Sequence, residues 1–255
     1  MEKFYKIKVV FLITLIVVII TCIILYTYNK KEEIIIGDEV QKSNDIQEQQ
    51  PIEICYYRST KTSRDFYDVA WLKLNLLGEK VTGEFQNLPA EKDSKIGTFE
   101  GTVGSLDQKI MGRRAIVWWN SLAEGMNVKE ELAIEFGDGS ATIGFGEMIN
   151  RGDGVYVYKD KNNLTYFDSL NQYDCEYLDE KLFTEKYIRD NINIIATNKP
   201  VLGGSWYVLS INVNPAVHTG EIVYEDGHIR STASLIYSYE KDPQSILVTK
   251  FEVKN

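Results

Sequence analysis

The chain has 255 residues, 44% of them apolar and 25% charged, a globular composition that excludes wholesale disorder. A formal net charge of −9 at pH 7 excludes binding to nucleic acid by charge, because phosphates attract a basic surface. Aromatic residues make up 12% of the chain, which is typical of half-buried strands.

An apolar run occupies residues 9–28, after a short tail at residues 1–8 that contains three lysines. At about 1.5 Å per residue the run spans about 30 Å, the thickness of a hydrocarbon core. No small-residue cleavage site follows, which favours an uncleaved signal-anchor over a cleaved signal peptide. Lipidation at Cys22 is an alternative, but the apolar run continues past that cysteine. The lysines predict a cytoplasmic tail, so we expect a single-pass membrane protein with its C-terminal domain outside the cytoplasm, in the cell envelope.

Residues 29–52 are polar, acidic and rich in glutamine, and we interpret them as a tether. The remainder is acidic, since residues 32–255 contain 23 lysines and arginines against 36 aspartates and glutamates. Such a surface favours solubility and does not attract anionic partners.

Strand patterns dominate residues 53–177. Residues 68–77 alternate between an aliphatic face and a face with Trp71 and Lys73, and residues 80–86 and 96–103 alternate in the same way. Glycines next to aromatic residues inside these strands indicate close backbone approach, as in small closed barrels. About eight strands with regular turn signals predict an antiparallel, barrel-like β domain.

Two local features complicate this region. The spacing of apolar residues predicts one inserted helix at residues 107–124, which Gly125 would end. Residues 137–140 predict a hairpin turn, and residues 155–159 and 164–169 are expected to form another hairpin with each other.

Residues 178–255 are predicted to form a helix and a small antiparallel sheet docked on the barrel. The helix is expected at residues 178–197, where Leu182, Ile188 and Ile192 contribute to an apolar stripe. Three or four strands follow, and Asp226-Gly227 predicts a hairpin between two of them. The expected fold class is therefore mainly β.

Two of the three cysteines, Cys55 and Cys175, lie in this exported region. Cys55 is in the first strand and Cys175 just after the last strand of the expected barrel. Because the first and last strands of a closed barrel are neighbours, we predict a disulfide between them. The alternative is two unpaired buried thiols in an open sandwich.

No motif for a catalytic nucleophile, a metal site or a phosphate-binding loop occurs, and only two histidines are present. We therefore predict no catalytic residue, metal or cofactor. Four glutamates leave a glycosidase pair open: Glu130, Glu131, Glu135 and Glu147. On residues 131–136, however, glutamates alternate with apolar residues, which predicts a solvated face.

The tryptophans are the candidates for a binding site. Trp118, Trp119 and Trp206, with the many tyrosines, could line a ligand cavity. Packing in the core is the alternative role for the same residues.

Five segments resemble an uncharacterised family of membrane-anchored or lipoprotein-like bacterial proteins: residues 68–75 (DVAWLKLN), 81–103, 118–148, 198–208 (NKPVLGGSWYV) and 223–229 (VYEDGHI). The resemblance extends over most of residues 55–255. It implies a bacterial origin, and no activity or site residue comes with it.

The sequence thus favours non-catalytic binding of a small ligand or of an envelope partner protein, with no nucleic acid involved. Two alternatives remain, a glycan-acting hydrolase with a carboxylate pair and a structural subunit of an envelope complex. An aromatic-lined cavity would favour the first function, and two carboxylates about 5–10 Å apart in one groove would favour the hydrolase.

Overall fold

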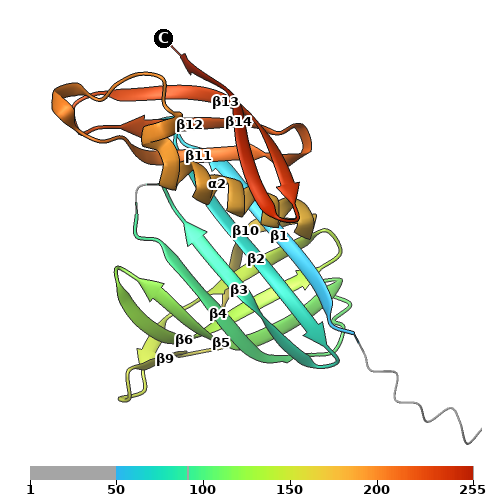
Figure 1. Cartoon of the computed structure of the whole chain (residues 1–255). Helices are drawn as coiled ribbons and strands as arrows, with labels where there is room; N and C mark the ends of the chain where they lie inside the picture. Colours follow the sequence, from blue (N-terminus) through green and yellow to red (C-terminus); the bar gives the residue numbers. More distant parts are fainter. Residues whose placement is uncertain (1–49, 91, 255) are drawn as a thin grey trace, which may run out of the picture. The chain divides into compact units, whose positions relative to one another are not determined.

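The structure, a computed structural model, describes residues 50–90 and 92–254, and these residues belong to one compact unit (Figure 1). The predicted tail, membrane span and most of the tether lie outside the described residues. Among the residues that are described, no helix combines the length and the apolar character needed to cross a bilayer.

Eight antiparallel strands form a closed barrel, which confirms the predicted barrel. The order around the barrel is β1-β2-β3-β4-β5-β6-β7-β10, and β10 returns to pair with β1. The strands are β1 (Ile52–Lys61), β2 (Tyr67–Leu77), β3 (Lys80–Leu88), β4 (Lys95–Val103), β5 (Gly112–Ala123), β6 (Met126–Gly137), β7 (Ser140–Phe145) and β10 (Thr165–Tyr173).

The barrel core comes from the inward face of the alternating pattern. Leu72, Leu74 and Val81 are fully buried inside, whereas Trp71 faces outward, as predicted. A Cβ added at Gly83 would lie 2.0 Å from the backbone oxygen of Lys73, so that strand position requires glycine. The close backbone approach expected at the strand glycines is present there.

The predicted helix at residues 107–124 is wrong, because residues 112–123 form strand β5. From Ala115 to Ser121 every second residue of β5 is buried, including Val117 and Trp119, which is a strand period rather than a helical one. Glu124 and Gly125 both have positive φ, 49° and 77°, and connect β5 to β6 as a two-residue hairpin. Gly125 is therefore a turn residue and not a helix terminator.

The hairpin predicted between residues 155–159 and 164–169 is also wrong. Strand β9 (Val155–Tyr158) pairs with β8 (Met148–Asn150) and, in parallel, with the first half of β6. Strand β7 pairs only with the second half of β6, so β9 occupies the wall position that β7 leaves. The hairpin predicted at residues 137–140 is confirmed by the β6–β7 pairing.

The C-terminal part consists of helix α2 (Cys175–Ile195) and a four-stranded antiparallel sheet. The helix begins three residues before the predicted start because Asp174 caps it, accepting hydrogen bonds from the backbone of Glu176 and Tyr177. The sheet contains β11 (Tyr207–Asn214), β12 (Thr219–Glu225), β13 (Arg230–Lys241) and β14 (Gln244–Lys254), and two 3₁₀ turns lie at Val201–Gly203 and Pro215–Val217. The β12–β13 hairpin at Asp226-Gly227 is confirmed.

Helix α2 lies between the barrel and the C-terminal sheet (Figure 1). Its Leu178 packs against Cys55 and Trp71 on the outer wall of the barrel, while Ile188 and Ile192 pack against the sheet. The structure joins Cys55 to Cys175 by a disulfide, with the two Cα atoms 5.3 Å apart. The outer wall of β1 is therefore covalently tied to the start of the helix.

Candidate functional site

A cavity of about 390 Å³ lies at one end of the barrel, the end where β1 and β3 finish and β2 begins. The other end is filled by side chains such as Leu76, Val81 and Val103, all nearly inaccessible to solvent. The cavity is thus a mouth and not a channel. Its volume is within the range of about 300–1,000 Å³ that is usual for small-molecule sites.

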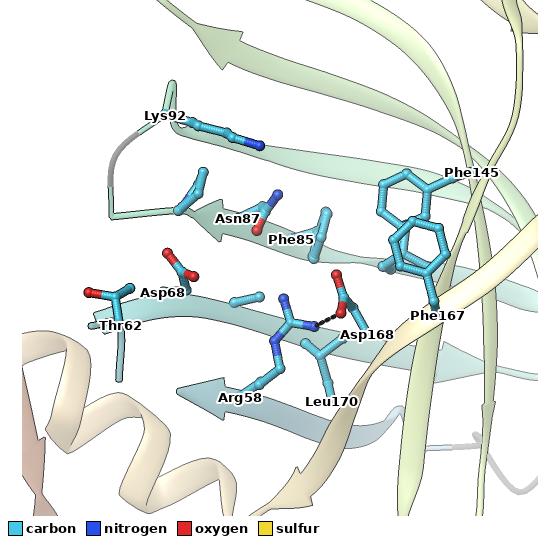
Figure 2. Close-up of a pocket in the computed structure, with 13 residues that line it drawn as sticks. Arg58, Thr62, Asp68, Phe85, Asn87, Lys92, Phe145, Phe167, Asp168 and Leu170 are labelled. Carbon is cyan, nitrogen blue, oxygen red and sulfur yellow. Dashed lines mark ion pairs between the residues drawn. The ribbon is translucent and has the colours of Figure 1, made fainter. Parts of the chain in front are cut away.

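The floor of this cavity is apolar. Ala70, Phe85, Ile143 and Leu170 form it, each at most 5% exposed. At one side of the mouth the rings of Phe145 and Phe167 stack, with centroids 4.5 Å apart and planes 16° from parallel (Figure 2). These two rings are 42% and 48% exposed, an unusual exposure for a stacked pair and one that suits contact with a further apolar group.

Charged side chains stand above the floor. Arg58 extends into the cavity from β1, and its Nη1 lies 3.3 Å from a carboxylate oxygen of Asp168 (Figure 2). Asp68 lines the mouth from the neighbouring strand β2 and accepts a hydrogen bond from the Ala90 backbone at 2.7 Å. Asn87 lines the cavity from β3, on the far side of β2 from Arg58.

Asp168 has a strained backbone, with φ at +60°. It lies at a bulge where the pairing of β10 with β7 shifts register between Phe167 and Leu170. A bulge re-aims side chains, and here it places both Phe167 and Asp168 at the rim of the cavity.

A second chamber of about 220 Å³ adjoins the first and shares four lining residues with it, among them Phe85 and Asn87. Glu130 lines this chamber, and its carboxylate accepts a hydrogen bond from Lys95 Nζ at 2.8 Å. The same ammonium lies 5.5 Å from the ring centroid of Trp119, whose indole packs against Phe85.

The solvated face predicted for the glutamates of residues 131–136 is wrong for Glu131, which is 7% exposed. Strand β9 covers it, so that its carboxylate accepts hydrogen bonds from the Tyr158 backbone and from Lys161 Nζ, at 3.0 and 2.6 Å. The sequence pattern correctly predicted that the Glu131 side chain points outward. It did not predict that strand β9 covers this side chain, because β9 pairs with β6 in parallel and is 25 residues or more away in the sequence.

The Tyr158 hydroxyl occupies the fork where β7 leaves β6. It accepts from the Ala133 backbone N–H at 3.2 Å and donates to the Gly144 carbonyl at 2.8 Å. Burial raises the pKa of this hydroxyl to about 12, so it keeps its proton at neutral pH. Gly144 and Tyr158 both line the second chamber, and the fork is therefore part of its wall.

The three candidate tryptophans do not come together. Trp119 lines the second chamber, whereas Trp118 faces the outside of the barrel, with Lys129 and Arg151 each 5.7 Å from its ring. Trp206 is buried between α2 and the C-terminal sheet, where its indole N–H donates to the Asn198 carbonyl at 3.0 Å. Core packing is the role of Trp206.

Sequence reasoning missed Arg58, Asp168 and the Phe145–Phe167 pair. The alternation of β1 could have predicted Arg58. Ile54 and Tyr56 point into the barrel, and Arg58 is the next residue on the same face, so its charge lies inside the barrel. Asp168 had no such signal, because its direction depends on the bulge.

No protein-family model, curated protein or solved structure matches this chain. The resemblance noted from the sequence stays a prediction, and the function is argued from the geometry of the site alone.

Proposed function

We propose that this protein binds a small, partly apolar ligand at the mouth of its barrel, without catalysis. The observation that supports this most directly is the cavity of about 390 Å³, which combines an apolar floor, an exposed aromatic pair and a few polar groups. Small-molecule sites have this composition, and the mouths of β-barrels are a usual place for them.

The same proposal includes a place for the protein. The apolar run at residues 9–28 would hold the barrel at the membrane, outside the cytoplasm. The Cys55–Cys175 disulfide supports this, because disulfides persist in oxidising compartments. A periplasmic or extracellular reporter fused to the C-terminus should be active, and activity of a cytoplasmic reporter there would contradict the orientation.

A glycan hydrolase is the less favoured function. It would need two carboxylates facing the ligand, one of them with a proton to donate. Both carboxylates of the first chamber are already engaged, Asp68 by a backbone N–H and Asp168 by Arg58. The arrangement suits holding a molecule better than cleaving it.

Calorimetric titration of the full-length protein in detergent tests the binding proposal. The probes are three water-soluble aryl compounds of the same length, 4-phenylbutyrate, 4-phenylbutanol and 4-phenylbutylamine, each compared with a detergent blank. At least one should bind saturably, and Ala70→Phe, which fills the floor, should abolish that binding.

Phe167→Ala is the second variant, since this exposed ring can be truncated without opening the core. It should weaken binding without changing the melting temperature by more than a few degrees. Absence of saturable binding for all three probes, or equal binding to Ala70→Phe with an intact fold, would contradict the proposal.

A further inference from the structure

The hydrogen-bond donors and acceptors that line the cavity differ in how many partners they have within the protein. Within the described part of the chain, the Arg58 guanidinium has a single charged partner, Asp168, and no other side-chain hydrogen bond to a protein group. A guanidinium carries five N–H donors, so most of its capacity is open toward the cavity. Its side chain is only 23% exposed, which limits how well water can satisfy it.

The carboxylates of the same region each have a partner in the protein. Asp68 accepts from the Ala90 backbone, and Glu130 accepts from Lys95. By contrast, the Trp119 indole N–H, in the wall of the second chamber, has no hydrogen-bond partner among the described residues. Two donors with little access to solvent, the Arg58 guanidinium and the Trp119 indole N–H, are therefore incompletely paired, and a ligand that brings acceptors would complete them.

We propose that the ligand of the barrel mouth is an amphipathic monocarboxylate whose carboxylate pairs with Arg58 and whose apolar body lies between the floor and the Phe145–Phe167 stack. This inference rests on the proposed function and specifies its ligand class. A guanidinium matches a planar carboxylate with two parallel hydrogen bonds, which an ammonium cannot do.

The charges of the rim limit the charge of the ligand. Asp68 and Asp168 line the chamber together with Arg58 and Lys92, so two carboxylates already balance the two cations, and a dianion such as a phosphate monoester would meet both of those carboxylates. A single negative charge can replace Asp168 as the partner of Arg58. Asp168 is 60% exposed in its side chain and can turn toward water when the ligand arrives.

Asp168 thus competes with the ligand carboxylate for Arg58. Asp168→Asn should increase carboxylate affinity, because it frees the guanidinium, and asparagine tolerates a positive φ. Asp65→Asn is the matched control. Asp65 also has a positive φ, 65°, and also pairs with a basic residue, Lys61 at 3.2 Å, but it does not line the cavity.

The test extends the calorimetric titration of the full-length protein. We expect 4-phenylbutyrate to bind at least about tenfold more tightly than 4-phenylbutanol or 4-phenylbutylamine. Arg58→Gln should remove that preference and Arg58→Lys should retain part of it, while Arg113→Gln, at the filled end of the barrel, should change nothing. Asp168→Asn should tighten butyrate binding severalfold and leave the alcohol unchanged.

The failures can be told apart. If the alcohol or the amine binds as tightly as the butyrate, or if the preference survives in Arg58→Gln, the carboxylate inference is overturned and the binding function stands. If Asp168→Asn weakens butyrate binding, the competitor role is overturned. If none of the three probes binds, the proposed function fails, and this inference fails with it.

Discussion

At the scale of single residues, the Tyr158 hydroxyl joins strands β6 and β7 of the barrel wall, although Tyr158 itself lies on β9. Ala133 and Gly144 face each other in the β6–β7 ladder, and Tyr158 from β9 bridges the Ala133 N–H and the Gly144 carbonyl. Tyr158 is 7% exposed, which limits how readily water can take over this role. The wall and the chamber behind it are coupled to β9 through one oxygen atom.

Tyr158→Phe should lower the free energy of unfolding by about 1–3 kcal/mol, because it leaves a buried N–H and a buried carbonyl without their partner. Urea denaturation measures this. Tyr156→Phe on the same strand is the control, since the Tyr156 hydroxyl makes no hydrogen bond to a described residue, and it should stay within about 0.5 kcal/mol of the wild type. Equal effects of the two substitutions would contradict the bridging role.

At the scale of elements, helix α2 presents charged residues to the C-terminal sheet. Lys181 is 1% exposed, and its Nζ bonds to Asn212 Oδ1, the Val213 carbonyl and Glu185 Oε1 at 2.7, 2.6 and 2.8 Å. Glu180 is buried as well and accepts a hydrogen bond from the Tyr237 hydroxyl at 2.9 Å. These contacts fix how the helix meets strands β11 and β13.

The helix contains a second lysine–acid pair at the same spacing, which allows a matched comparison. Lys181→Ala should destabilise the fold by about 3–5 kcal/mol, since it leaves Glu185, whose side chain is only 13% exposed, without its cation. Lys186→Ala breaks the exposed pair with Asp190 and should cost about 0.5 kcal/mol or less. Thermal or urea unfolding of both variants tests this, and a loss for Lys186→Ala as large as that for Lys181→Ala would contradict it.

Some of the elements could be predicted from the sequence, and others could not. Alternation placed β2, β3 and β4 with the correct inward faces, because each repeats its pattern over a whole strand. The segment at residues 107–124 failed because its apolar residues fit both periods and its decisive turn needed two positive φ values. Strand β9 and the bulge at Asp168 depend on tertiary pairing, which no local pattern contains.

At the scale of the whole molecule, polar contacts join the barrel to the C-terminal layer. The Tyr67 hydroxyl of β2 donates to Glu221 of β12 at 2.8 Å, and Lys254 of β14 bonds to the same carboxylate at 2.6 Å. The hydrogen bonds from Lys254 and then Tyr67 lower the pKa of Glu221 from 4.5 to about 2. The ionised carboxylate therefore stabilises the joined layers.

This pKa predicts a pH-dependent contribution to stability. A carboxyl group whose pKa falls on folding stabilises the protein above its unfolded value of 4.5, and that contribution disappears as the pH falls toward about 2. The melting temperature of Glu221→Gln should therefore be lower than that of the wild type at pH 7, and the difference should shrink at pH 2.5. Tyr67→Phe should lose part of the same effect, whereas a difference independent of pH would contradict the assignment.

The central claim is that the barrel mouth holds a small ligand, and the position of a bound probe tests it most directly. A crystal structure of the protein saturated with 4-phenylbutyrate should show the ring against Phe85 and the Phe145–Phe167 stack, with the carboxylate at Arg58. A probe found on the outer wall of the barrel or between α2 and the C-terminal sheet, or an empty mouth at saturating concentration, would contradict the claim.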